Sequence, residues 1–145
     1  MFNLGHGSVA GVWGYQGSKP FIWRDRLYAS LGDAVCCLDI ASEEVVWEKK
    51  LQGDTPEGVV DSIATPPALA NDKVFVGTAR GEVFALSAET GDALWTERVD
   101  VPLDFQLTVS EGRVIVPSRC GGLFCLETGD PQDSGWKMWG ATSAH

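Results

Sequence analysis

Residues 81–95, which read GEVFALSAETGDALW, decide the fold of this chain. They begin with an apolar run rich in Val, Phe and Leu, continue through the turn-forming group Thr90-Gly91-Asp92, and end in a second apolar run that reaches Trp95. Short runs of this composition, separated by a turn signal, are typical of strands and not of helices. The stretch therefore predicts two antiparallel strands joined by a tight turn.

The same pattern occurs three times along the chain. Segments 26–51, 73–99 and 113–130 align with one another, and the third follows the second at a constant offset of 40 residues as far as Leu126. In the second copy the apolar runs and turn residues predict strands over 67–70, 74–78, 82–87 and 93–98. Four antiparallel strands in each unit of about 40 to 48 residues are typical of one blade of a β-propeller.

The repeats predict an all-β chain of about three four-stranded antiparallel blades. The partial propeller covers 1–145, and its copies span approximately 18–51, 65–99 and 105–140. An immunoglobulin-like sandwich would also have many short strands, but it would not repeat its sequence at this period. A closed propeller usually needs about 4 to 8 blades. We therefore expect the single chain to be incomplete, and its open blade edges to bind further blades, a second copy or a partner protein.

The copies resemble the PQQ-like, or quinoprotein-type, β-propeller repeat, whose blades read Gly-x-hydrophobic-Tyr-Ala-Leu-Asp-x-x-Thr-Gly-x-x-x-Trp. Residues 81–95 match this pattern almost completely. The resemblance implies a tryptophan-docking motif, in which a Trp lies flat between adjacent blades, a small residue leaves room for it, and a Gly forms the turn. The second copy fits the motif with Ala85, Gly91 and Trp95. The first copy fits in spacing only, with Cys37, Glu43 and Trp47.

The third copy departs from the pattern after Leu126, because its loop has a different length and moves Trp136 out of register. The tail from 127 to 145 resembles the segment that ends many propellers of this family and latches the ring. This resemblance implies that the chain contributes the C-terminal blades of a propeller.

Two adjacent cysteines, Cys36 and Cys37, raise the question of redox chemistry. Alcohol dehydrogenases of the quinoprotein family have a disulfide between neighbouring cysteines that stacks against the quinone. Here Cys37 aligns with Ala85 and Cys125 in the small-residue position beneath a docked Trp, and neighbouring strand residues point to opposite faces of a sheet. We therefore interpret the pair, and Cys125 with it, as buried packing residues, since buried cysteine behaves as a small apolar side chain.

Cys120 lies in a turn beside Arg119 and is the candidate reactive thiol, because a neighbouring cation can lower the pKa of a thiol. No histidine lies near it in sequence to act as a base. Asp61, Asp104 and Arg119 are expected near the central channel or on the loop face.

No metal site or catalytic set is predicted. The chain has two histidines, His6 and His145, both near its ends, and its cysteines do not have the spacing of zinc ligands. The general base and the calcium ligands that the family resemblance would require beside a quinone are not recognisable in the sequence. We therefore expect no cofactor, and in particular no PQQ.

Composition excludes several classes of partner. Acidic residues outnumber basic ones 20 to 11, which gives a formal net charge of -9, so nucleic acid would be repelled. No apolar run approaches the roughly 18 to 20 residues that span a bilayer. The N-terminal residues lack the pattern of a signal peptide, and four cysteines are too few for a disulfide framework, which favours a cytoplasmic location.

The sequence thus predicts a non-catalytic propeller segment that acts as a binding or scaffold module. The alternative is a fragment or subunit of a quinoprotein-type dehydrogenase, or of a larger enzyme complex, whose active site lies mostly in other blades.

Overall fold

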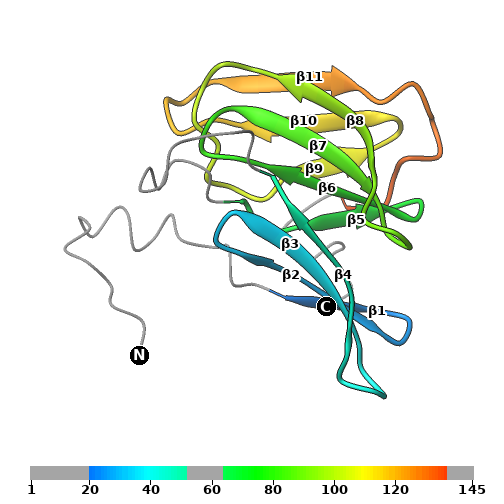
Figure 1. Cartoon of the computed structure of the whole chain (residues 1–145). Helices are drawn as coiled ribbons and strands as arrows, with labels where there is room; N and C mark the ends of the chain where they lie inside the picture. The colour runs from blue at the N-terminus through cyan, green and yellow to red at the C-terminus, as the bar shows by residue number, and fades with distance from the viewer. Residues whose placement is uncertain (1–19, 52–63, 137–145) are drawn as a thin grey trace.

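The computed structural model describes residues 20–51 and 64–136. These residues form three antiparallel sheets, which lie one after another in Figure 1. We call the sheets blade 1, blade 2 and blade 3. Within these ranges there is no helix that could span a membrane. The eleven strands are β1 (Phe21–Trp23), β2 (Arg26–Leu31), β3 (Ala34–Asp39) and β4 (Val45–Lys50) in blade 1; β5 (Ala68–Ala70), β6 (Lys73–Gly77), β7 (Glu82–Ser87) and β8 (Ala93–Arg98) in blade 2; and β9 (Thr108–Ser110), β10 (Arg113–Pro117) and β11 (Leu123–Glu127) in blade 3.

The prediction of an all-β chain built from propeller blades is confirmed. In blades 1 and 2 the four strands follow in chain order, with sheet orders β1-β2-β3-β4 and β5-β6-β7-β8. Strands β7 and β8 have the predicted bounds, whereas β5 and β6 begin or end one residue away from them. The turn between β5 and β6 consists of Asn71 and Asp72, both with positive φ (51° and 55°), as a two-residue hairpin turn of type I′ requires.

Blade 3 differs from the prediction, because its described part has three strands in the order β11-β10-β9. Trp136 does not continue a fourth strand beside β11. It forms an antiparallel bridge with Val109 on the free side of β9, with N···O distances of 2.7 and 3.1 Å. In the residues that the structure describes, β11 is therefore an edge strand, whereas its counterparts β3 and β7 are covered by β4 and β8.

Blade 2 forms the centre of the hydrophobic core, because it has a blade on each side. Val74, Val76, Val83 and Leu86 from its two middle strands have no exposed surface. A strand that is buried on both faces has apolar residues in succession and not in alternation. This explains why residues 83–86 read as an unbroken apolar run.

Cross-strand pairing shows which side chains share a face. Cα partners point to the same side of a sheet, and the side chains that blade 1 directs at blade 2 define what we call the forward face; the opposite side is the back face. The forward face contains the partner sets Tyr28, Cys37 and Trp47 in blade 1; Phe75, Ala85 and Trp95 in blade 2; and Ile115 and Cys125 in blade 3.

Candidate functional site

The junction between blades 1 and 2 is closed by Trp47. This side chain lies in the middle of β4 and is 8% exposed. Its Nε1 donates a hydrogen bond of 3.1 Å to the carbonyl oxygen of Ala88 in blade 2. A Cβ atom built on Gly91, whose φ is +77°, would lie 2.6 Å from two carbons of the indole ring. The ring therefore lies directly on the glycine turn of the next blade, where any other residue would collide with it.

Tyr28 supports the same junction from the neighbouring strand. Its hydroxyl also donates to the Ala88 carbonyl, at 3.1 Å, and its ring lies 6.1 Å from that of Trp47. Burial, with a smaller contribution from Cys37, raises the pKa of Tyr28 to about 12. The hydroxyl is thus protonated at physiological pH and acts as a hydrogen-bond donor.

The structure separates the residues that the repeat placed in one motif. Ala85 and Trp95 are cross-strand partners within blade 2, but Gly91 of the same copy contacts Trp47 of the copy before it. Trp95 is only half-buried, and its ring contact is with Phe75 of its own blade, at 6.0 Å between centroids. The docking unit thus combines a Trp from one blade with a Gly from the next, and the Ala88 carbonyl that completes it has no sequence signature.

The junction between blades 2 and 3 is charged. Lys73 at the start of β6 places its Nζ 2.6 Å from Asp133 and 3.0 Å from Asp130, and the Asn71 amide bonds the same two carboxylates at 2.9 and 3.0 Å. Burial works to lower the pKa of Lys73, but the hydrogen bonds to Asp133 and Asp130 outweigh it and raise this pKa. The sequence analysis missed this cluster, although a basic residue opens the aligned segment of every copy: Arg26, Lys73 and Arg113.

Acid should weaken this junction through Asp130. The backbone N–H of Gln132, followed by the ammonium of Lys73, holds the pKa of Asp130 below its usual 3.8. A carboxyl group whose pKa is lower in the folded than in the unfolded chain stabilises the fold above its unfolded pKa, and this contribution is lost as the pH falls through the folded value. As the pH is lowered below about 4, we expect the free energy of unfolding, measured by urea titration, to fall less for the Asp130→Asn variant than for the wild type. Asp100→Asn is the matched control, because Asp100 pairs with Arg98 at the open surface; equal acid sensitivity of the wild type and the Asp130 variant would contradict the assignment.

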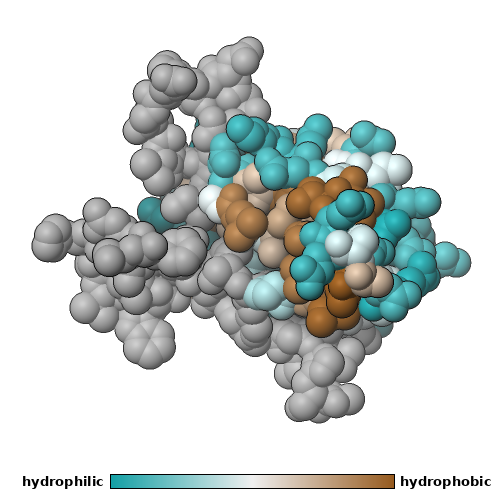
Figure 2. All heavy atoms as spheres, turned by 60° about the horizontal axis from the view of Figure 1, so that its bottom comes forward, coloured by the Kyte–Doolittle hydropathy of each residue, from teal (hydrophilic) through white to brown (hydrophobic). Residues whose placement is uncertain are grey.

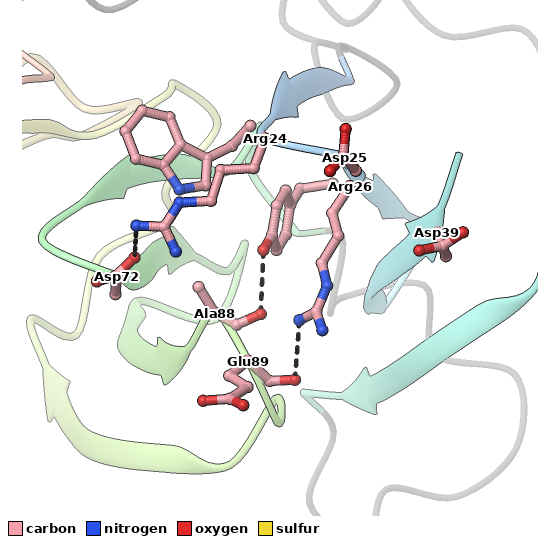
Figure 3. A pocket seen from close by; sticks show the side chains of 9 residues that line it. Arg24, Asp25, Arg26, Asp39, Asp72, Ala88 and Glu89 are labelled. Carbon is pink, nitrogen blue, oxygen red and sulfur yellow. Dashed lines mark hydrogen bonds and ion pairs between the residues drawn. The ribbon is translucent and has the colours of Figure 1, made fainter. Parts of the chain in front are cut away.

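A pocket of about 500 Å³ lies next to the docked Trp47, between the turns of blades 1 and 2 (Figure 3). Arg26 crosses it and donates a hydrogen bond of 3.3 Å to the carbonyl oxygen of Glu89. Arg24 forms an exposed ion pair with Asp72 at 3.5 Å. Polar groups of both signs therefore line the pocket; its complete lining is Trp23, Arg24, Asp25, Arg26, Tyr28, Asp39, Asp72, Ala88 and Glu89.

The adjacent thiols Cys36 and Cys37 are both free and buried. They lie on opposite faces of β3: Cys36 donates to the Ala29 carbonyl at 3.6 Å, whereas Cys37 is the cross-strand partner of Tyr28 and Trp47. Burial raises the pKa of both thiols. Both groups are therefore protonated near neutral pH and poorly reactive.

The other two thiols are exposed. Cys120 lies in the turn between β10 and β11, and the guanidinium of the adjacent Arg119 forms a two-point ion pair with Asp104, with an Nη2–Oδ1 distance of 2.6 Å. The expectation that Cys125 is a buried packing residue is wrong. It has the small-residue position of its blade, but β11 has no fourth strand on it among the described residues, so no Trp covers the thiol.

Thiol labelling should separate these two classes. In a dilute solution of the folded chain, we expect Cys120 and Cys125 to react rapidly with a thiol reagent at pH 8, and Cys36 and Cys37 to react only after unfolding. Four thiols should be counted in denaturant without reductant. A count of two, with both Cys120 and Cys125 labelled, would show that the adjacent pair is oxidised and would contradict the packing interpretation.

Several expectations concern residues outside the described ranges. These are His6, Asp61, and the tail from 137 onwards, including His145. In residues 20–51 and 64–136 there is no group of three His, Cys, Asp or Glu side chains arranged to hold a metal ion.

Comparison with known families matches residues 58–139 to the family model described as outer membrane protein assembly factor BamB. Among curated proteins, the chain is 32% identical over 110 residues to quinohemoprotein alcohol dehydrogenase ADH IIB of Pseudomonas putida, which covers 68% of this chain and 16% of that protein. It is 30% identical over 106 residues to the assembly factor BamB of Shewanella oneidensis, covering 70% of this chain and 26% of that protein.

Solved structures show the same two kinds of propeller. The chain superposes on BamB from Moraxella catarrhalis with a TM-score of 0.65 and 22% identity, covering 86% of this chain and 34% of that one. It superposes on quinohemoprotein alcohol dehydrogenase from Comamonas testosteroni with a TM-score of 0.66 and 21% identity, covering 79% of this chain and 20% of that one. The chain thus spans about a third or less of each of these four relatives.

Proposed function

This chain belongs to the PQQ-like repeat family described as outer membrane protein assembly factor BamB, and we propose that it is a non-catalytic propeller segment that binds other proteins. Relatives of two kinds match it, namely enzymes and assembly factors. A propeller blade is compatible with both activities. The arrangement of the adjacent thiols Cys36 and Cys37 favours the assembly-factor type of function.

Polar side chains hold the described blades against one another. The hydroxyl of Tyr28 and the indole of Trp47 bond the backbone of blade 2, and Lys73 bonds the carboxylates of Asp130 and Asp133. Each of these groups holds one blade against the next. They stabilise a rigid platform, on which loops and blade edges remain available for a partner.

The adjacent thiols do not fit the quinone arrangement of the family's dehydrogenases. A disulfide between neighbours that stacks on a quinone needs both sulfurs on one side of the chain. Here the two side chains lie on opposite faces of a regular strand, and the thiols of Cys36 and Cys37 are both free. These residues therefore offer no site of that kind for a quinone.

The edge strand β11 and the inter-blade pocket are the surfaces we propose for binding. An edge strand offers unpaired backbone N–H and C=O groups, to which an extended segment of a partner can add as a further strand. The name of the assembly factors points to proteins of outer membrane assembly as the partner class. The pocket, with side chains of both charges, suits a polar loop of such a partner.

A quinone titration tests the proposal against the alternative of a dehydrogenase segment. The purified chain is mixed with PQQ and Ca²⁺, passed through a desalting column, and examined by absorbance and by thermal melting. We expect no retained chromophore and no shift of the melting temperature. Retention of about one quinone per chain, with a melting temperature that rises only when Ca²⁺ is present, would show that the chain is part of a quinoprotein enzyme and would overturn the proposal.

A further inference from the structure

The junction between blades 2 and 3 contains an acidic turn that is held by two side chains of blade 2. Lys73 and Asn71 each bond the carboxylates of Asp130 and Asp133, with N···O distances of 2.6 to 3.0 Å. Both carboxylates come from one turn, in which the N–H of Asp133 donates to the carbonyl oxygen of Asp130 at 3.0 Å. The chain thus contains one example of how the end of a blade junction receives two carboxylates.

Arg24 and Arg26 occupy in blade 1 the positions that Asn71 and Lys73 occupy in blade 2. Arg24 and Asn71 each follow the first strand of their blade and have a positive φ, of 54° and 51°. Arg26 and Lys73 are each the first residue of the second strand, β2 or β6. Blade 1 therefore presents hydrogen-bond donors at the two positions from which blade 2 bonds carboxylates.

The turn of blade 2 supplies no carboxylate to Arg26. Thr90 stands 40 residues before Asp130, which is the offset of the two copies, and its hydroxyl bonds the carboxylate of Asp92 in its own turn at 2.7 Å. Arg26 reaches the backbone carbonyl oxygen of Glu89 instead, at 3.3 Å. Among the residues that the structure describes, Arg26 has no ion pair. The pocket of about 500 Å³ lies where the acidic turn lies at the next junction.

Arg24 is held at the rim of this pocket by weak contacts. Its guanidinium carbon lies 5.6 Å from the centroid of the Trp23 ring, and its Nη2 lies 3.5 Å from the carboxylate of Asp72. The side chains of that ion pair are 71% and 67% exposed, and exposed pairs contribute little free energy. Figure 3 shows Arg24 and Arg26 extending from the β1–β2 hairpin toward the turns of blade 2. Both guanidinium groups can therefore bond a ligand without breaking a strong contact.

The acidic residues of the lining leave Arg26 without a contact ion pair. The Oδ1 atom of Asp39 accepts from the backbone N–H and from the hydroxyl of Ser42, at 2.9 and 3.1 Å, and so bonds its own turn. Asp25 and Glu89 are exposed to solvent. Water and salt screen exposed charges that are not in contact, so a carboxylate that touches Arg26 directly has an advantage over them.

Apolar side chains border the pocket and enlarge the surface that a bound segment would cover. Trp23 of the lining and Ile40, which follows Asp39, are 42% and 44% exposed. Figure 2, in which the bottom of Figure 1 comes forward, shows hydrophobic residues gathered within a border of hydrophilic ones. Burial of apolar surface offsets the repulsion that a net charge of -9 exerts on an acidic segment, and salt screens this repulsion.

From this correspondence we propose that the pocket between blades 1 and 2 binds an acidic turn of a partner protein, with two carboxylates three residues apart, as in the chain's own turn. Arg26 bonds the carboxylates as Lys73 does at the next junction, and Arg24 has the part of Asn71. A guanidinium suits this role, because it can bond a carboxylate through two parallel hydrogen bonds. The inference rests on the proposed function, since it names the chemistry of the partner that the propeller segment binds.

A peptide copy of the chain's own acidic turn tests the site. The probe is residues 128–135, TGDPQDSG, acetylated and amidated so that its two aspartates carry its only charges. The control peptide has asparagine in place of both aspartates. When the acidic peptide is titrated into the full ¹⁵N-labelled chain, we expect the indole N–H resonance of Trp23 to shift to saturation, and we expect no shift with the control peptide.

Variants locate the bound peptide. Arg26→Gln and Arg24→Ala should each weaken its binding about tenfold or more, because hydrogen bonds to charged groups are among the strong ones. Arg26→Lys and Arg24→Asn, which supply the side chains of Lys73 and its neighbour in the turn, should each lose less. Arg98→Gln should leave the affinity unchanged, because its pair with Asp100 lies at the open surface. Thermal melting of each variant shows that it is folded.

Several outcomes would contradict the acidic-turn site. These are equal binding of the two peptides, binding that is indifferent to Arg24→Ala and Arg26→Gln, and inorganic phosphate that binds the pocket more tightly than the acidic peptide, which would mark a phosphate site. Absence of peptide binding in a chain that retains no quinone would overturn the inference and leave the proposed function standing. Peptide binding by a chain that retains quinone with Ca²⁺ would do the reverse.

Discussion

Replacement of Trp47 by alanine is expected to lower the free energy of unfolding by about 3 to 5 kcal/mol, the usual cost of removing a large aromatic side chain from a core. The indole is 8% exposed and fills the space over Gly91, so its loss leaves a cavity between two blades and removes the hydrogen bond to Ala88. Small domains are stable by only about 5 to 15 kcal/mol. Urea unfolding, followed by circular dichroism, measures the change.

Two further variants separate the contribution of the Trp47 hydrogen bond from that of docking on the next blade. Trp47→Phe keeps most of the ring and loses the Nε1 bond, so we expect a smaller loss of about 1 kcal/mol beyond the change in packing; the Ala88 carbonyl keeps its bond from Tyr28. Trp95→Ala removes the equivalent residue of the next copy, which is half-buried, and should cost about 1 to 2 kcal/mol. Equal losses for Trp47→Ala and Trp95→Ala would mean that docking on the next blade adds nothing.

Replacement of Gly91 by alanine should have the second largest effect, about 3 kcal/mol. A φ of +77° in a residue with a Cβ costs about 1 to 2 kcal/mol. The new methyl group would also lie 2.6 Å from the ring of Trp47, and overpacking of this kind typically adds about 1 to 3 kcal/mol. The shift of the urea midpoint measures the sum.

Gly129 provides a matched control for the backbone term. Its φ is +80°, close to that of Gly91, but a Cβ there would meet no atom within 4 Å. Gly129→Ala should therefore cost only the conformational part, about 1 to 2 kcal/mol. If both glycines gave the same loss, the tryptophan contact would not constrain the turn.

The repeat made the blades predictable, because strand periodicity and turn chemistry are local properties of the sequence. Strand β7 and strand β8 have the predicted bounds, and the two-residue turn at Asn71 and Asp72 follows from residues that tolerate positive φ. The alignment also selected the tryptophans and the glycine that face the junctions. These features depend on residues within one blade.

The alignment of the repeats gave a wrong prediction for Cys125, because its aligned position implied burial. Burial depends on a neighbour, and β11 lacks one in the described part of blade 3. The Lys73 cluster was missed for a related reason: Asp130 and Asp133 follow the point where the third copy leaves the pattern, so alignment could not place them near Lys73. The basic residue that opens each copy was the available signal.

The sequence by itself determined the all-β class, the three repeats, the strands and turns of blade 2, and the opposite faces of Cys36 and Cys37, because all of these follow from spacing along one chain. Only the tertiary structure decided which Trp meets which Gly, that one carbonyl oxygen accepts from both Tyr28 and Trp47, and that Trp136 pairs with β9 and leaves β11 at the edge. These are contacts between blades, and they depend on how each sheet is oriented on the next. An aligned position specifies a side chain, and its burial depends on the neighbouring blade.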